Sequence, residues 1–130
     1  MDGVQTITVG EEFHIRRGDI LLVDLRGAEG GEKMGCRPAL VLQNNVGNDN
    51  ADTTIVAPIT SQYDPNDLYP FEVELKHEEF DLETDSVVQL NQIRTITIDN
   101  RVEDIFGWVD DDKMAEIDSA LSHTLGLTDE

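Results

Sequence analysis

Short apolar runs, each bounded by turn-forming residues, follow one another along most of the chain. Runs of this length with turn residues at both ends are typical of β-strands. The pattern predicts strands at residues 20–25, 39–42, 53–57, 71–75, 86–90 and 93–98. Pro58 follows the third run and lacks a backbone N–H, so it predicts a strand end or a sheet edge there. Glutamates alternate with apolar residues in 71–75, so one face of that strand should meet solvent.

The C-terminal part of the chain changes to a helical period. From Asp111 onward, apolar residues recur three or four positions apart, at Met114, Ile117, Leu121 and Leu125. Aspartates at 110–112 suit the N-terminus of a helix, because carboxylates accept the unpaired N–H groups there, and Gly126 suits a left-handed C-cap. Many short strands followed by one helix predict a mainly β fold, a small and strongly curved antiparallel barrel or sandwich with a C-terminal helix.

The length of 130 residues corresponds to one domain. We expect an N-terminal arm at residues 1–14, which lack periodicity, and one folded domain at residues 15–130. No window approaches the roughly 18 uncharged apolar residues of a membrane span, and the first residues do not resemble a signal peptide. The sequence therefore predicts a cytoplasmic protein that does not enter a membrane.

Acidic residues outnumber basic ones by 28 to 9, which gives a formal net charge of -19. Taken alone, this charge argues against binding to nucleic acid, because such binding normally relies on Lys and Arg displacing counterions from phosphates. Lysine is scarce and aspartate is dispersed along the chain, a composition that suggests a halophilic protein. In molar salt the Debye length falls to about 3 Å, so the repulsion of a polyanion weakens. An ordinary acidic protein, or one that binds a basic partner, is the alternative.

Few residues offer catalytic chemistry. The three histidines stand far apart in the sequence, and no serine or cysteine lies in a nucleophile-elbow or phosphate-loop motif. The single cysteine, Cys36, excludes an intrachain disulfide and a cysteine zinc site, and no neighbouring base in the sequence would activate it as a nucleophile. Aspartates 110–112 are interpreted as a helix cap, since a hard cation needs oxygens converging from several directions. We therefore expect neither a metal nor a cofactor.

The most informative position is Arg37, which stands between a glycine-rich segment at residues 26–36 and an apolar strand. Pro38 biases Arg37 toward an extended backbone, and the glycines leave the preceding segment free to move. An arginine fixed at a strand start suits an anionic ligand or transition state, because its planar guanidinium donates to two oxygens at once. An ion pair with a neighbouring acidic residue is the alternative interpretation.

Five ordered blocks carry a family resemblance over about residues 16–127. They are Arg17–Ile20 with Asp24–Leu25, Gly35–Asn44 with Gly47–Asn48, Thr54–Thr60, Tyr69–Val73, and Asp85–Val88 with Gln92–Thr95. With these blocks the chain resembles the MazF/PemK family of type II toxins, endoribonucleases that are neutralised by MazE-like antitoxins. The resemblance implies a homodimer of SH3-like barrels, of the type found in the CcdB and PemK toxins. It also implies cleavage of single-stranded RNA at short sequences without metal, leaving a 2′,3′-cyclic phosphate and a 5′-hydroxyl.

The resemblance also implies roles for single residues. The family's catalytic arginine matches Arg37, and its catalytic threonine or serine matches Thr60. Its substrate-contacting glutamine matches Gln92, and its flexible loop after the first strand matches residues 26–36. Further contacts to RNA are expected from Gly31, Lys33, Gln43, Asn44 and Arg94.

Both catalytic candidates suit RNA cleavage without metal. That reaction uses the 2′-hydroxyl as an internal nucleophile, so the protein must orient the phosphate in line and stabilise the added negative charge of a five-coordinate phosphorane. Arg37 would supply positive charge and a proton for the leaving 5′-oxygen. Thr60 would hydrogen-bond the phosphate, and a structural hydroxyl at a strand end is its alternative role.

Two other functions are compatible with the same barrel. One is a toxin without enzymatic activity, like the CcdB toxins that bind DNA gyrase, in which Arg37 and Thr60 would have no required role. The other is a degenerate homologue that only binds its antitoxin. The excess of acid, the N-terminal leader and the shortage of lysine depart from a typical family member, so the cleaved RNA sequence does not follow from the resemblance.

Overall fold

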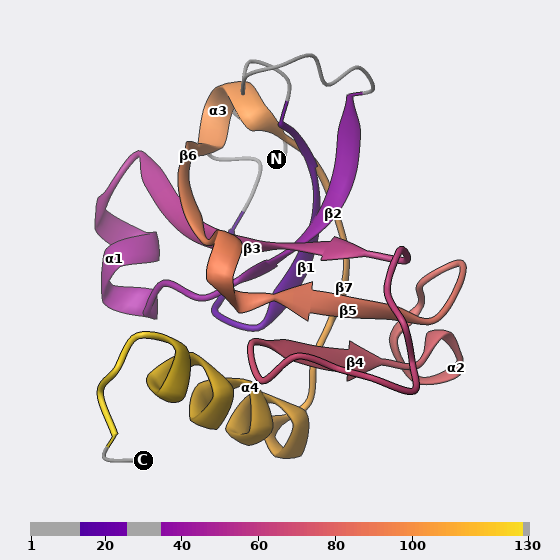
Figure 1. The fold of residues 1–130 in the computed structure, drawn as a ribbon. Coiled ribbons are helices and arrows are strands. Elements are labelled where there is room, and N and C mark those ends of the chain that lie inside the picture. The colour runs from indigo at the N-terminus through magenta and orange to yellow at the C-terminus, as the bar shows by residue number, and fades with distance from the viewer. Residues whose placement is uncertain (1–13, 26–34, 129–130) are drawn as a thin grey trace.

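The computed structural model describes residues 14–25 and 35–128 (Figure 1). Residues 1–13 of the predicted arm and 26–34 of the glycine-rich segment lie outside the described residues. The elements in chain order are β1 (Asp19–Asp24), β2 (Cys36–Val41), α1 (Asn45–Asn50), β3 (Thr53–Thr60), β4 (Glu72–Leu75), α2 (His77–Phe80), β5 (Ser86–Gln89), the 3₁₀ turn η3 (Leu90–Gln92), β6 (Arg94–Thr97), α3 (Ile98–Arg101), β7 (Val102–Trp108) and α4 (Asp111–Thr124).

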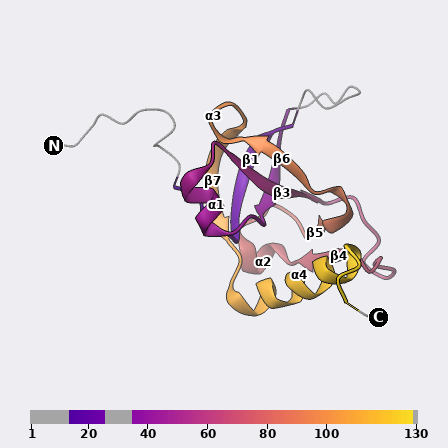
Figure 2. The same ribbon diagram turned by 90° about the vertical axis from the view of Figure 1, so that its left-hand side faces the viewer.

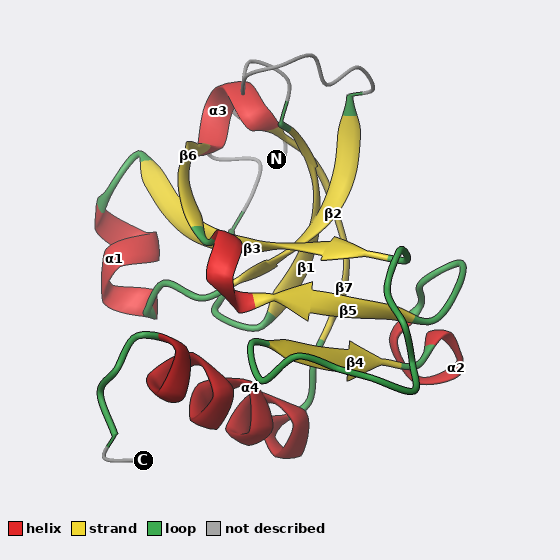
Figure 3. Ribbon diagram, viewed as in Figure 1, coloured by secondary structure: helices red, strands yellow, loops and turns green. Residues whose placement is uncertain are grey.

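The described strands form one antiparallel sheet with β3 at its centre. The order is β4-β5-β3-β2-β1-β7, and β6 also pairs with β3. β4 and β7 end the order without pairing to each other, so the curved sheet is not closed. The helices lie around the sheet, with α4 packed along one side of it (Figure 3). The predicted mainly β architecture with a C-terminal helix is confirmed.

Pro58 lies inside β3, so the predicted strand end at this residue is wrong. The N–H of Leu42 donates to the carbonyl of Ile55 at 2.8 Å. Hydrogen-bonded pairs alternate along an antiparallel ladder, so the pair of Ala39 and Pro58 is a non-bonded one. The missing N–H of Pro58 therefore faces away from β2, where β6 has ended opposite Val56 and β5 has not yet begun. No ladder bond is lost there, which is why the strand tolerates proline.

β7 is absent from the predicted strands. Its sequence mixes two acidic residues and a glycine with apolar ones, and its pairing with β1 shifts register twice. Each irregularity breaks the alternation of apolar and polar positions on which strand prediction relies. The tertiary contact with β1 forms this strand where the local pattern does not predict one.

Two apolar clusters fill the two sides of the sheet. Neighbouring residues of one strand separate between them, as strand alternation requires, so Ile20 belongs to one cluster and Leu21 to the other. α4 covers the first cluster and buries Met114 and Ile117. Figure 2 shows α4 running below the strands. Truncating the fully buried Ile117 to alanine would cost about 2–5 kcal/mol.

Both predicted ends of α4 are confirmed. Asp110 Oδ1 accepts the backbone N–H of Lys113 at 2.9 Å and so caps the N-terminus. Gly126 has a φ of +76°, the left-handed conformation that glycine adopts without steric cost. Arg17 fastens the helix to the sheet, because its Nε donates to the carbonyl of Leu42 at 2.8 Å and its Nη2 lies 2.5 Å from Asp118 Oδ1.

Candidate active site

Arg37 and Thr60 line one cavity, which opens where β2 and β3 separate. The two strands pair only as far as Ala39 and Pro58. Beyond that pair, the start of β2 follows β1, while the end of β3 follows β5. Figure 1 shows the two strand ends diverging. The gap contains a cavity of about 500 Å³, so the structure brings together the two residues expected to be catalytic.

The walls of the cavity come from three parts of the chain. One wall is the pair of diverging strand ends, and the opposite wall is the segment between α2 and β5. Apolar side chains from β1 and β7 complete the lining. The lining residues are Leu22, Cys36, Arg37, Pro38, Ile59, Thr60, Ser61, Gln62, Asp81, Leu82, Glu83, Thr84, Ser86 and Phe106.

The Arg37 guanidinium is exposed and has no hydrogen-bond or ion-pair partner among the described residues. Five other described basic residues are engaged elsewhere: Arg16 with Asp49 at 3.0 Å, Arg17 with Asp118, Arg101 with the carbonyl of Asp24, and Lys76 and Lys113 with neighbouring acids. The alternative interpretation of Arg37, an ion pair with a neighbouring acid, thus finds no support in the described part of the chain. Its charge faces a cavity that could admit an anion.

The Thr60 hydroxyl makes one structural hydrogen bond and can still donate another. Its Oγ1 accepts the backbone N–H of Gln62 at 3.1 Å, which shapes the turn after β3. A hydroxyl that accepts one hydrogen bond still has its own hydrogen to donate. Thr60 can therefore hold this turn and donate to an oxygen in the cavity at the same time.

Several polar groups of the cavity are missing from the candidates found in the sequence. Asp81, Glu83, Thr84 and Ser86 belong to the wall opposite the strand ends. Asp81 has a φ of +59°, a left-handed conformation that aspartate tolerates better than most residues. Ser86 lies in one of the motif blocks, which is the only local feature that could have pointed to this wall. The carboxylates of Asp81 and Glu83 lower the potential of the cavity and oppose the charge of Arg37.

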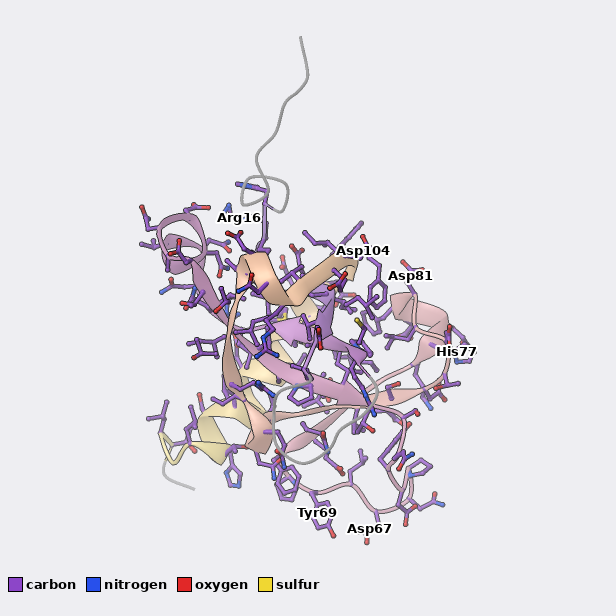
Figure 4. All side chains as sticks on the ribbon, turned by 90° about the horizontal axis from the view of Figure 1, so that it is seen from above. Arg16, Asp67, Tyr69, His77, Asp81 and Asp104 are labelled. Atoms are coloured by element: carbon purple, nitrogen blue, oxygen red, sulfur yellow. The ribbon has the colours of Figure 1, made fainter. Side chains whose placement is uncertain are left out.

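A hydrogen-bonded pair closes the segment that forms this wall. His77 Nδ1 lies 2.7 Å from Asp85 Oδ1, and the backbone N–H of His77 donates to the same oxygen at 2.9 Å. These side-chain and backbone hydrogen bonds lower the pKa of Asp85 to about 2. His77 and Asp81 lie on the same flank of the molecule (Figure 4). The pair joins the start of α2 to the residue before β5, so it helps to position the wall residues that lie between them.

The other expected RNA contacts do not line this cavity. Gln92 is exposed in η3, and Arg94 begins β6 opposite Val56, without a partner among the described residues. Gly31 and Lys33 lie outside the described residues.

Gln43 and Asn44 follow β2 at the end remote from Arg37. Gln43 Nε2 donates to the carbonyl of Thr53 at 2.9 Å, and Asn44 Oδ1 accepts the N–H of Gly47 at 2.8 Å. Both side chains hold α1 and its surroundings in place. The fold therefore does not place these two residues, which were expected to bind RNA, at the cavity.

The helices among the described residues are all too short or too polar to span a membrane. Within the same residues, no group of three or more His, Cys, Asp or Glu side chains is placed to hold a metal ion.

The chain is similar to a known protein family and to several solved structures. Residues 16–125 match the family described as PemK-like, MazF-like toxin of type II toxin-antitoxin system. The chain is similar to MazF from Deinococcus radiodurans, with 26% identity, a TM-score of 0.70, and coverage of 88% of this chain and 99% of that chain. It is similar to an endoribonuclease solved in complex with its cognate antitoxin from a mycobacterial species, with 25% identity, a TM-score of 0.69, and coverage of 90% and 98%. The Mycobacterium tuberculosis toxin MazF-mt6 shares the fold, with 22% identity, a TM-score of 0.69, and coverage of 85% and 98%.

Proposed function

Because the chain belongs to the PemK-like, MazF-like family of toxins of type II toxin-antitoxin systems, we propose that it is a metal-independent endoribonuclease that cleaves single-stranded RNA. The observation that carries the proposal is the cavity shared by Arg37 and Thr60. The sequence resemblance implies catalytic positions at both residues, and both present polar groups that no described residue fully occupies.

In the proposed reaction, the ribose 2′-hydroxyl gives up its proton to solvent and its oxygen attacks the adjacent phosphorus. The bond from phosphorus to the 5′-oxygen breaks, and that oxygen takes up a proton. The products are a 2′,3′-cyclic phosphate on one fragment and a 5′-hydroxyl on the other. Since the nucleophile belongs to the substrate, the protein contributes orientation and charge stabilisation.

Arg37 has the larger role in this scheme. Arginine stays protonated at all relevant pH values, so it offers a fixed positive charge to the phosphorane and a donor close to the leaving oxygen. The Thr60 hydroxyl donates to a second phosphate oxygen and so fixes the in-line orientation. Loss of one such preorganised donor typically slows an enzyme by about 10²–10³-fold.

The acidic wall makes the proposed activity depend on salt. Asp81 and Glu83 line the cavity that must admit a phosphate, and the whole chain has a net charge of -19. Concentrated salt screens both repulsions, because the Debye length shrinks to a few ångströms. We therefore place the working range of the enzyme in concentrated KCl, as expected for a halophilic, cytoplasmic protein.

A MazE-like antitoxin and a second copy of the chain are the proposed partners. A similar endoribonuclease is solved with its cognate antitoxin, which supports an antitoxin partner here. We propose that the active form is a homodimer and that a segment of the antitoxin covers the cavity, so that antitoxin and RNA compete. A saturated complex that cuts RNA as fast as the free toxin would contradict this shared site.

The proposed activity is tested by incubating the purified chain with a defined single-stranded RNA in multimolar KCl that contains EDTA. We expect discrete cleavage products, and their suppression by the antitoxin. Absence of cleavage over the whole KCl range in which the protein is folded would favour a toxin without enzymatic activity or a homologue that only binds its antitoxin. Under either alternative, Arg37 and Thr60 have no required role.

A further inference from the structure

A small notch around an exposed tryptophan adjoins the candidate active site. Trp108 ends β7 and is 72% exposed, although tryptophan is on average a well-buried residue. The notch has a volume of about 190 Å³, and we call it the Trp108 notch. It is lined by Glu79, Phe80, Asp81, Trp108 and Asp110. Asp81 also lines the cavity of Arg37, so the two hollows share a wall.

Three carboxylates supply the polar part of the Trp108 notch. The side chains of Glu79 and Asp81 have no hydrogen-bond or ion-pair partner among the described residues. The carboxylate of Asp81 lies against β7, because a Cβ placed on Gly107 would be 3.7 Å from Asp81 Oδ2. Asp110 uses one oxygen to cap α4. One tryptophan and three carboxylate residues thus line the same notch, and its described lining contains no basic residue.

We propose that the Trp108 notch binds an arginine side chain of the antitoxin. The inference rests on the antitoxin partnership proposed above and names the chemistry that recognises it. A guanidinium stacks on an indole face through a cation–π interaction, and its edge donates to carboxylates. The notch is smaller than the roughly 300–1,000 Å³ pockets that enclose whole ligands, so it suits a single side chain. A phosphate would meet only negative charge there.

The position of the notch links this contact to inhibition. A chain segment with an arginine in the Trp108 notch would pass beside Asp81 and reach the mouth of the cavity that holds Arg37. The acidic surface of the toxin favours a basic segment over RNA at this place. The notch would therefore add affinity for the antitoxin without taking part in RNA cleavage.

Fluorescence tests the chemistry of the notch without the antitoxin. Trp108 is the one tryptophan of the chain, so the intrinsic emission reports on this site alone. The folded toxin is titrated with N-acetyl-arginine amide and, separately, with the uncharged analogue N-acetyl-citrulline amide, at the lowest KCl concentration that keeps the protein folded. We expect a saturable change of emission with the arginine probe and none with citrulline. Equal responses to both probes, or no response to either, would overturn the proposal.

Matched variants test the role of the notch in antitoxin binding. Glu79→Gln with Asp110→Asn removes two notch charges, and asparagine still caps a helix. Glu78→Gln with Asp112→Asn removes the same charge from the same two helices, at exposed positions outside the notch. We expect the double variant in the notch to lower the affinity for the antitoxin about tenfold or more and to abolish the fluorescence response to the arginine probe. The affinity of the control double variant should stay within about twofold of wild type. RNA cleavage by free toxin should not change in either variant.

The outcomes separate this inference from the proposed function. Equal loss of antitoxin affinity in both pairs would show a general charge effect and reject the notch. If the emission changes with toxin concentration but not on addition of antitoxin, the notch lies in the interface between two toxin copies. That result would also reject the proposal. Failure of the wild-type toxin to cut RNA would refute the proposed activity and leave the fluorescence result standing.

Discussion

Replacing Arg37 with alanine should strongly slow RNA cleavage and leave the fold intact. The side chain is exposed and has no partner among the described residues, so its truncation leaves no buried charge unpaired. Surface substitutions of this kind change the free energy of unfolding by about 0.5 kcal/mol or less. By contrast, loss of a preorganised donor to a developing charge costs about 2.7–4 kcal/mol in the transition state. We therefore expect a fall of at least ~100-fold in the rate of the chemical step.

The assay is single-turnover cleavage with toxin in excess over RNA, because it isolates the chemical step from product release. Arg94→Ala is the matched control, since Arg94 also lacks a described partner but lies outside the cavity. It removes the same charge and should weaken RNA binding more than the saturated rate. Arg37→Lys should fall between alanine and wild type, because lysine keeps a point charge but loses the planar pair of donors.

Thermal unfolding followed by circular dichroism checks that each variant is folded. A folded Arg37→Ala variant that cleaves within about tenfold of wild type would refute the catalytic assignment. So would an equal loss of the saturated rate in Arg94→Ala, because the effect would then reflect overall charge.

Three further predictions follow from the same geometry. Thr60→Ala should slow single-turnover cleavage, whereas Thr60→Ser keeps the hydroxyl and should retain most of the rate; equal loss in both variants would assign Thr60 to strand packing. The folded pKa of Asp85 lies below its ordinary value of 3.8, at about 2, so the charged carboxylate contributes stability above about pH 4 that is lost as the pH falls toward 2. Acid unfolding of Asp85→Asn, followed by circular dichroism, should lack this part of the pH dependence, and identical acid transitions would show that the contact with His77 contributes nothing. Because of the net charge of -19, folding and cleavage should both require concentrated KCl, and a chain that is folded and most active near 0.1 M KCl would refute the halophilic assignment.

Local patterns predict most of the fold because most elements follow a simple period. Six strands are short apolar runs bounded by turn residues and the last helix has helical spacing, and the structure contains all of them. β7 is not predicted, because its two register shifts disrupt the alternation of apolar and polar residues. Pro58 gives a wrong prediction for a different reason. The missing N–H is tolerated because neither β5 nor β6 pairs with β3 at this residue, and local sequence does not show which strands pair with β3.

The candidate site is predicted only in part. Arg37 is recognisable from the turn chemistry around it, while Thr60 is indicated by the family resemblance alone. The opposite wall, with Asp81 and Glu83, reaches the cavity through the pairing of β5 with β3, so no local motif identifies it. Gln43 is near Arg37 in sequence, but the five residues between them run along β2 and just beyond its end, which separates the two by roughly 20 Å.

The chemistry at the cleaved bond shows whether the ribose 2′-hydroxyl is the nucleophile. A single-stranded RNA is prepared with one 2′-deoxyribose at the mapped cleavage position, and it is compared with the unmodified RNA in multimolar KCl that contains EDTA. We expect the unmodified RNA to give a 2′,3′-cyclic phosphate and a 5′-hydroxyl, identified by mass spectrometry, and the deoxy substitution to abolish cleavage. Cleavage of the deoxy-substituted strand, a 5′-phosphate product, or complete inhibition by EDTA would refute metal-independent cleavage through the 2′-hydroxyl.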